Sequence, residues 1–287
     1  MSLFQKVKDF FSRGRYYMQT LNLNSILEHP RIAVTQEEYD RIRRNVVYYQ
    51  SKWDDVQYKN TDGDIQSRPM NHLPIARTAS KKIASLVYNE QATITAKDST
   101  LSKFLDDMLI NDRFNKNFER YLESALALGG LAMRPYVDGD KIRVAFIQAP
   151  VFFPLESNTQ DVSSAAILTK TIKSEGRKNV YYTLVEFHEW VTADGQETGS
   201  TNDKKYYRIT NELYRSDVND VLGQRVNLSE LDKYKNLEPV TVFENLSRPL
   251  FTYLKTPGMN NKDINSPLGL SIFDNAKTTI DFINRSY

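Results

Sequence analysis

The transition that decides the fold lies between Leu128 and Ile147, in the stretch L-G-G-L-A-M-R-P-Y-V-D-G-D-K-I-R-V-A-F-I. Gly129 and Gly130 close a helical pattern, because glycine readily adopts the left-handed conformation at a helix C-terminus. Beyond them, apolar residues alternate along two arms that Asp138-Gly139, a favoured two-residue hairpin turn, separates. Pro135 in the first arm indicates an edge position. The chain therefore passes here from helices to antiparallel strands.

The segments before this stretch have helical apolar spacing. Thr35 and Glu38 have the spacing of a capping box, and the helix that follows has an apolar face flanked by Arg41. Another helix is predicted to begin near Pro74, since proline is tolerated in a first turn. Its predicted buried face comprises Ile75, Ala76, Ala79, Ile83, Leu86 and Val87. Two more helical patterns, from Leu101 to Leu109 and from Phe114 to Ala125, complete this region.

The segments after this stretch have the alternation of strands. We predict strands over Ala166 to Lys173, Val180 to Trp190 and Lys205 to Thr210, with a polar hairpin loop from Asp194 to Asp203. They form a meandering antiparallel sheet. A last helical pattern, whose apolar face is predicted to include Ile272 and Ile283, still runs at Tyr287 without a C-terminal cap. The fold class is therefore α+β, and we expect the chain to be a fragment of a longer protein.

The composition excludes several classes of chemistry. The 287 residues are 40% apolar and 26% charged, with a formal net charge of +2, which is typical of a globular domain. There is no cysteine, so thiol catalysis and cysteine-ligated metal are excluded. No apolar run approaches the roughly 18 residues of a membrane span. Leu3 to Phe11 has the pattern of an amphipathic helix. Its apolar face fits docking to a core or a partner, and it also fits binding to a membrane surface.

Candidate catalytic and metal-binding residues are few. Asp62 and Asp64, like Asp138 and Asp140, straddle a glycine, a pattern of paired carboxylates that can hold a cation but is also typical of turns. The three histidines do not form a metalloenzyme motif. They are His29, His72 and His188. His188 and its neighbour Glu189 fall on opposite faces of a strand. We therefore expect no catalytic residue, no metal site and no cofactor.

Aromatic residues favour an interaction protein over an enzyme. The chain has 17 tyrosines and 14 phenylalanines, and tyrosine is enriched where proteins meet. Lys81 and Lys82 form the most exposed basic pair predicted on a helix, a pattern that fits a solvated face or a contact with a partner. No residue that contacts DNA or a partner can be assigned from a motif.

The order of short segments along the chain carries a family resemblance. The segments are Arg43-Arg44, Tyr48-Tyr49-Gln50 with Trp53, Asn71 to Glu90, Phe114 to Ala132, Tyr136 to Ile142, Phe153-Pro154, Glu186-x-His188-x-Trp190, Asn211 to Tyr214 and Ser266 to Gly269. In this order they resemble the N-terminal part of the portal protein, or head–tail connector, of tailed bacteriophages, of the kind found in siphophages of Gram-positive bacteria. Each string is unspecific, and the resemblance rests on their shared order.

The resemblance implies a structural subunit of a ring at the capsid vertex of the virion, made in the bacterial cytoplasm. Its expected partners are further copies of itself, the terminase large subunit, the major capsid or scaffold protein, the head–tail adaptor, and double-stranded DNA that passes without sequence preference. Family members are normally longer. The expected segments are 1–60 N-terminal helical, 61–130 helical wing, 131–248 β-rich wing, and 249–287 loop and start of the stem helix.

Two other functions stay open at the level of sequence. The amphipathic stripe from Leu3 to Phe11 fits a phage-encoded adaptor or a protein that binds a membrane surface. The carboxylate pairs at Asp62 and Asp138 fit a carboxylate-dependent hydrolase, a phosphodiesterase or a glycosidase. The portal function is the one that accounts for most of the chain.

Overall fold

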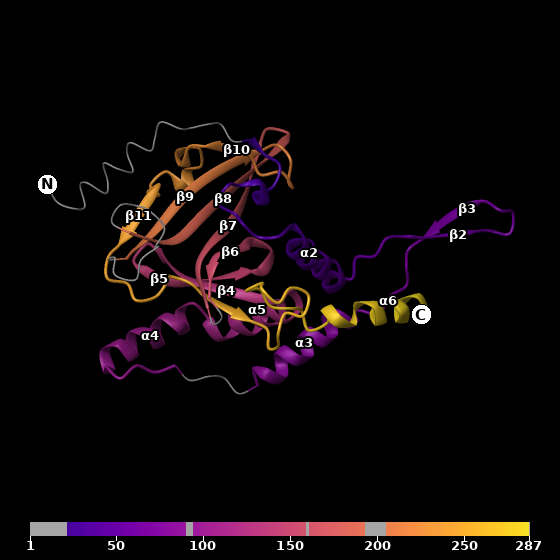
Figure 1. Ribbon diagram of the computed structural model, residues 1–287, viewed down its shortest axis with the longest axis horizontal. Coiled ribbons are helices and arrows are strands. Elements are labelled where there is room, and N and C mark those ends of the chain that lie inside the picture. The colour runs from indigo at the N-terminus through magenta and orange to yellow at the C-terminus, as the bar shows by residue number, and fades with distance from the viewer. Residues whose placement is uncertain (1–21, 90–93, 159–160, 193–204, 287) are drawn as a thin grey trace. The chain divides into compact units, whose positions relative to one another are not determined.

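The computed structural model describes residues 22–89, 94–158, 161–192 and 205–286. The helix predicted over Leu3 to Phe11 and the loop predicted from Asp194 to Asp203 lie outside these residues. The described chain is α+β, as predicted, with mostly antiparallel sheets (Figure 1). It divides into two compact units: unit 1 is Met1–Val34 with Val151–Leu250, and unit 2 is Thr35–Pro150 with Phe251–Tyr287.

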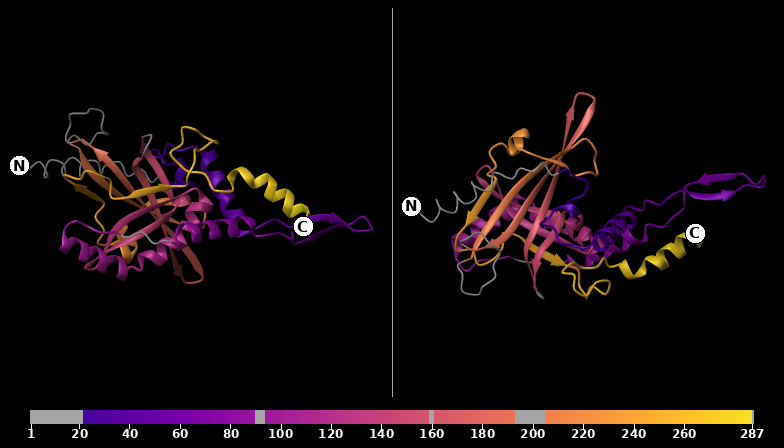
Figure 2. Two further views of the ribbon diagram at one scale, coloured as in Figure 1. Left: turned by 90° about the horizontal axis from the view of Figure 1, so that it is seen from below. Right: turned by 45° about the horizontal axis from the view of Figure 1, so that its top comes forward.

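Unit 1 is built on an antiparallel seven-stranded sheet with the order β1-β10-β9-β8-β7-β6, and β11 also pairs with β9. Its long central strands run side by side in both views of Figure 2. The strands are β1 (Asn22–Leu23), β6 (Phe152–Ser157), β7 (Val162–Glu175), β8 (Lys178–Val191), β9 (Tyr206–Ser216), β10 (Gly223–Val226) and β11 (Val240–Phe243). The predicted meander is confirmed, and its strands extend beyond the predicted limits.

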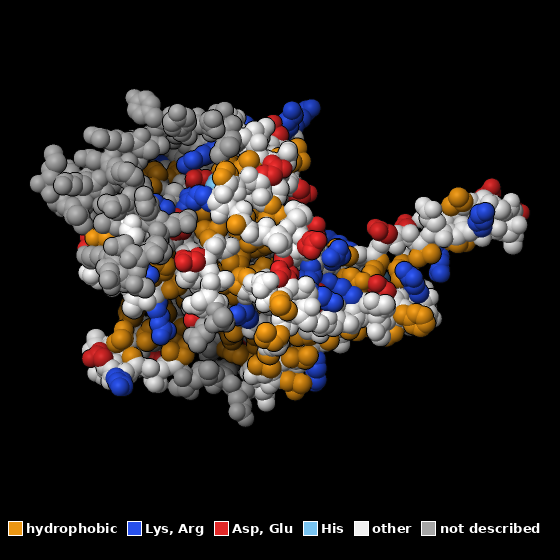
Figure 3. All heavy atoms as spheres, viewed as in Figure 1, with side chains coloured by type: hydrophobic (Ala, Val, Ile, Leu, Met, Phe, Trp, Pro, Cys, Tyr) orange, Lys and Arg blue, Asp and Glu red, His pale blue; other side chains and the backbone are white. Residues whose placement is uncertain are grey.

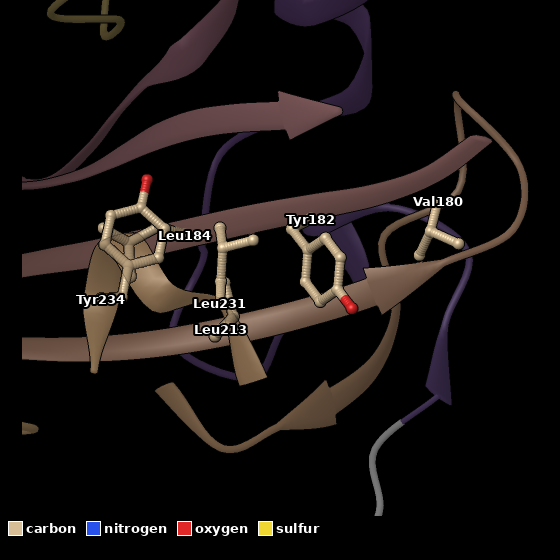
Figure 4. Close-up of a cluster of buried hydrophobic side chains, with 6 residues drawn as sticks. All are labelled: Val180, Tyr182, Leu184, Leu213, Leu231 and Tyr234. Carbon is tan, nitrogen blue, oxygen red and sulfur yellow. The ribbon is translucent and has the colours of Figure 1, made fainter. Parts of the chain in front are cut away.

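Both faces of strand β8 are covered. On one face, β8 and β9 place Leu184 opposite Leu213, and Leu231 and Tyr234 from the chain after β10 pack against them (Figure 4). On the other face lies Phe187, which the segment around His29 covers. Alternating side chains thus point to two covered faces of the sheet, which explains why this strand is almost continuously buried.

Unit 2 combines helices with two small sheets. Its helices are α2 (Gln36–Gln50), α3 (Ile75–Val87), α4 (Ser99–Asn111), α5 (Phe114–Leu128) and α6 (Lys277–Ser286). Strands β12 (Thr252–Lys255), β4 (Gly130–Asp138) and β5 (Lys141–Gln148) form one antiparallel sheet. Strands β2 (Val56–Lys59) and β3 (Ile65–Arg68) form the other, a hairpin around the predicted Asp62-Gly63 turn. Short 3-10 turns, such as Ile26–Glu28 in unit 1, link several elements.

The helix-to-hairpin transition is confirmed, with one refinement. Gly129 ends α5 in the left-handed region, at φ 98°, and β4 and β5 pair across the Asp138-Gly139 turn. Strand β4 is nevertheless central in its sheet, because β12 pairs with Gly130 to Met133. Pro135 lies just past that pairing, where β5 is the only neighbour, so the missing N–H leaves no ladder partner unsatisfied.

Three predictions for the helices of unit 2 are corrected by the structure. Thr35 is the N-cap of α2, but its side chain makes no capping hydrogen bond, and Glu38 forms a buried ion pair with Arg41. Arg41, predicted to flank the apolar face, is buried. On α3 the buried residues are small: Ala76, Ser80 and Ala84.

The large aliphatic side chains of α3, by contrast, are exposed. Ile83, Leu86 and Val87 were predicted to be buried, but small residues form the α3 surface that the rest of unit 2 covers. The core of unit 2 takes its large apolar groups from α5 and β4 instead, among them Leu122, Leu126 and Leu131.

The last helix begins later than predicted. A 3-10 turn over Asp274–Ala276 precedes α6, and Ile272 lies before both. In α6, Ile280 is buried whereas Phe282 and Ile283 are exposed. Asn284 anchors the helix, because its Oδ1 accepts a hydrogen bond from the backbone N–H of Leu73 at 3.0 Å.

Candidate functional site

The two carboxylate pairs singled out in the sequence are turn residues in the structure. The side-chain oxygen of Asn60 accepts backbone hydrogen bonds from Asp62 (3.0 Å) and Asp64 (2.8 Å), which organises the β2–β3 turn. Asp138 forms an ion pair with Arg143 at 2.7 Å across the β4–β5 hairpin. Within the described residues, no group of three or more metal-ligating side chains gathers. These residues shape hairpins.

The three histidines lie apart and in different settings. His72 Nδ1 lies 3.1 Å from the carbonyl oxygen of Met70. His188 is buried in β8, with Nδ1 2.9 Å from the hydroxyl of Tyr207. The carboxylate of Glu189, the next residue, binds Arg208 at 2.9 Å. His188 and Glu189 therefore engage different partners, as the alternation of a strand requires.

The third histidine belongs to a buried ion cluster that fixes the segment before α2 to the sheet of unit 1. The backbone N–H of Arg31 donates to Nδ1 of His29 at 3.2 Å, so Nε2 is free to donate to Glu212 at 3.2 Å. The Arg31 guanidinium binds Glu189, and its carbon lies 3.7 Å from the centre of the Phe187 ring. We call these residues the sheet cluster.

The carboxylates of the sheet cluster are stabilised in their ionised forms. Burial alone would raise the pKa of Glu212, but the hydrogen bond from His29 and the charge of Arg225 bring it below its ordinary value. The pKa of Glu189 is likewise lowered, because hydrogen bonds and charge from Arg31 and Arg208 outweigh burial. The hydroxyl of Tyr214 donates to Glu212 at 2.9 Å, and burial with this neighbouring charge raises the pKa of that tyrosine. The ionised carboxylates of the sheet cluster therefore hold the segment before α2 against the sheet of unit 1.

A second buried ion cluster lies in unit 2 and joins α2 to the chain before α6. Asp274 accepts hydrogen bonds from Arg41 (2.8 Å), Asn45 (3.1 Å) and Lys277 (2.7 Å). Glu38 binds the other side of the Arg41 guanidinium at 2.8 Å and accepts from the hydroxyl of Ser266 at 2.9 Å. We call these residues the helix cluster.

The ionisation of the helix cluster follows from the same contacts. Burial would raise the pKa of Asp274, yet the hydrogen bond and charge of Lys277 and the charge of Arg41 lower it. Burial also lowers the pKa of Lys277, and Asp274 only partly offsets this effect. Arg41 stays cationic, because Glu38 and Asp274 raise its pKa against the effect of burial.

Neither cluster has the arrangement of an active site. Their carboxylates are saturated by arginine, lysine, histidine, amide and hydroxyl donors from within the chain. Ion networks of this kind hold segments in place. Among the described helices, none has the length and apolar character to cross a bilayer.

Sequence reasoning missed both clusters. Arg41 was interpreted as flanking an apolar face and Glu38 as a cap, while Asp274 and Glu212 attracted no prediction. The partners Arg41 and Asp274 are 233 residues apart, and a single sequence does not record which distant charges meet. The available signal was the position of Arg41 only three residues after Glu38 on the same helix.

The residues that remain open to a partner lie on the surface. Lys81 and Lys82 are exposed, as predicted, on α3. In the described residues neither forms an ion pair within the chain. Figure 3 shows hydrophobic side chains on the surface over α3 and α4. A scaffold with saturated interior charges and a partly apolar exterior is typical of structural proteins that assemble.

The comparison with protein families agrees with this class. The family described as phage portal protein, SPP1 Gp6-like, matches residues 28–287. The chain belongs to this family of phage portal proteins, which are structural components of the bacteriophage capsid. Membership implies an oligomeric ring and a place at the capsid vertex of the virion. None of the curated proteins compared with the chain matches it.

Proposed function

We propose that this chain is the ring subunit through which double-stranded DNA enters the phage head during packaging and leaves it during ejection. The family match over residues 28–287 carries the proposal. The ring would dock the terminase large subunit during packaging and the head–tail adaptor afterwards, and would contact the major capsid or scaffold protein at the vertex. The chain acts as a structural element and performs no catalysis of its own.

The interior of each unit supports a structural role. A conduit subunit has to keep its shape while a motor and DNA exert force on it. The sheet cluster and the helix cluster both tie segments that are far apart in the chain by buried polar contacts, such as the Arg31–Glu189 and Arg41–Asp274 ion pairs. Removing one partner of such a pair leaves an uncompensated buried charge, so local opening is costly.

The charge balance is compatible with a conduit. A formal net charge of +2 over 287 residues lacks the excess of cations that would hold DNA phosphates strongly by counterion release. DNA that has to move benefits from weak, sequence-independent contacts. Under this proposal, residues 61–130 and 131–248 belong to the wing of the portal, and residues 249–287 contain the start of its stem.

The proposal is tested in two measurements on the natural gene product. First, light scattering after size exclusion should give a discrete ring many times the 33.2 kDa of this chain. Second, phage in which the gene carries a stop codon should assemble heads without DNase-protected DNA, and the gene supplied in trans should restore packaging. A product that stays monomeric at high concentration, with normal packaging in the mutant phage, would overturn the proposal.

A further inference from the structure

Helix α3 presents its large aliphatic side chains to solvent. Its buried residues are Ala76, Ser80 and Ala84, whereas Leu86 and Val87 are each 64% exposed. An amphipathic helix of a self-contained domain ordinarily turns its large apolar groups inward. The spacing of these residues in the sequence is that of a buried face, yet no described part of the chain covers them.

Helix α4 packs only lightly against α5 and β5 and leaves a second apolar surface of unit 2 exposed. None of its thirteen residues is buried, although six of them are large and apolar. Leu101 and Phe104 are 50% and 48% exposed and lie one helical turn apart. Six large apolar residues are more than a solvent-exposed helix needs, so the sequence of α4 indicates that part of its surface is covered by another surface.

The charges that flank these two apolar surfaces are opposite. Helix α3 contains three basic residues and no acidic one, and Lys81 and Lys82 stand beside its exposed aliphatic groups. Helix α4 contains Asp106 and Asp107 and a single basic residue. In the described part of the chain, none of these two lysines and two aspartates forms an ion pair. The net charge of α3 is therefore positive and that of α4 is negative.

Exposed apolar groups are concentrated on unit 2. Among the described residues, the large exposed apolar side chains of unit 1 are Ile172 and Val218, and all the others belong to unit 2. The described surface of unit 1 therefore has few large apolar side chains, whereas helices of unit 2 expose many, as surfaces that bind other proteins do. Lone exposed residues such as Ile172 are ordinary, so they provide matched controls.

We infer that the apolar, basic surface of α3 binds the apolar, acidic helix α4 of a neighbouring copy of the same chain. This inference rests on the proposed function, because it assigns a contact within the ring. A ring requires a head-to-tail interface in which two different surfaces of one chain meet. Two basic α3 surfaces facing each other would repel, whereas α3 against α4 pairs opposite charges around an apolar centre.

The first test uses apolar residues of matched exposure. Replacement of Leu86 and Val87 together by aspartate should release the ring to single chains, or raise the concentration for half-assembly at least about tenfold. The control is the I172D/V218D double variant of unit 1, which should assemble like wild type. All four positions are exposed, so both variants should keep the melting temperature of the unassembled chain.

The second test exchanges the charges. The K81E/K82E variant and the D106K/D107K variant should each weaken assembly, and a one-to-one mixture of the two should restore it, because a ring in which the two variants alternate places an acidic surface against a basic one at every contact. The chain that carries all four substitutions should recover the ring. Recovery in the fourfold variant identifies α3 and α4 as partners, which a merely structural effect of either substitution would not produce.

The outcomes separate the inference from the proposed function. A wild-type protein that never forms rings refutes the proposed function and with it this contact. Wild-type rings that persist in L86D/V87D refute the contact alone. If K81E/K82E leaves the ring intact and weakens binding of duplex DNA, the basic surface of α3 serves DNA, and the inference is wrong.

Discussion

Arg41 and Asp274, 233 positions apart in the chain, form a buried ion pair with 2.8 Å between Nη1 of the arginine and Oδ2 of the aspartate. Asp274 is the common acceptor of the helix cluster, since Asn45 and Lys277 also donate to it. It precedes α6 directly, and α6 is the helix that we propose begins the stem. The carboxylate of Asp274 therefore links α2 to the start of α6.

Replacement of Asp274 by alanine should be strongly destabilising. It leaves the buried Arg41 without one of its two carboxylates, a change that typically costs about 3–5 kcal/mol of unfolding free energy. Urea denaturation followed by circular dichroism measures the loss. Asp40→Ala is the matched control, because Asp40 pairs with Arg43 on the exposed side of α2 and should cost less than about 1 kcal/mol. Equal effects of the two substitutions would contradict the structural role of Asp274.

Acid should destabilise the protein because it protonates the buried, paired carboxylates of the two clusters. The pKa values of Glu189, Glu212 and Asp274 are lowered in the folded state. Their stabilising contribution is therefore complete above their unfolded pKa values, about 4, and is lost as the pH falls through the folded values. The free energy of unfolding should decrease from pH 5 to pH 3, by up to about 1.4 kcal/mol per pH unit for each proton taken up.

The variant Glu212→Gln makes this prediction specific. Glutamine has no charge to lose, so the stability of the variant should fall less steeply between pH 5 and pH 3 than that of wild type, while at pH 7 it is the less stable protein. Denaturation at several pH values measures both slopes. Parallel curves for the two proteins would show that Glu212 is not held below its ordinary pKa.

The alternation of strands was readily predicted because it is a local property. The period of two in Val180 to Trp190 and the Asp138-Gly139 turn specify the pairing of β8 and of the β4–β5 hairpin from neighbouring residues alone. The Gly129 helix end was predicted for the same reason. Pro135 is an instructive exception, since its location past the end of β12 depends on a strand more than 100 residues away.

The clusters and the outer surface of α3 were not predicted, and each for a physical reason. A capping box and a buried ion pair can use the same Glu38, and only the fold brings Ser266 within reach of that carboxylate. For α3, periodicity indicates which apolar side chains share a face of the helix but not which segment packs against that face. Leu86 was predicted to be in the core of this chain, and the structure leaves it 64% exposed.

Gly129 should tolerate no side chain. A Cβ there would lie 2.4 Å from the carbonyl oxygen of Gly269, and the backbone is left-handed at φ +98°. The left-handed conformation costs a non-glycine residue about 1–2 kcal/mol, and overpacking typically adds about 1–3 kcal/mol. Gly129→Ala should thus lower the unfolding free energy about twice as much as Gly63→Ala, where φ is +88° and no atom lies within 4 Å of the added Cβ. Thermal unfolding of both variants decides, and equal melting temperatures would refute the close approach.

Arg31 should control the attachment of the segment before α2 to the sheet of unit 1. It binds Glu189, lies 3.9 Å from Glu212, and stacks over Phe187. Cation–π contacts contribute about 0.5–2 kcal/mol and hydrogen bonds between charged groups about 1.5–3 kcal/mol, so Arg31→Ala should open this segment at least about tenfold more often. Hydrogen–deuterium exchange over residues 22–32 measures the opening.

Two controls complete this measurement. Arg31→Lys keeps the charge but loses the planar guanidinium, so exchange over residues 22–32 should be intermediate between wild type and Arg31→Ala. Peptides from α5 should exchange at the wild-type rate in both variants, because that helix belongs to unit 2. Faster exchange in α5 as well would mean that Arg31→Ala destabilises the whole chain, and unchanged exchange over residues 22–32 would mean that the segment is fixed by His29 and its apolar neighbours alone.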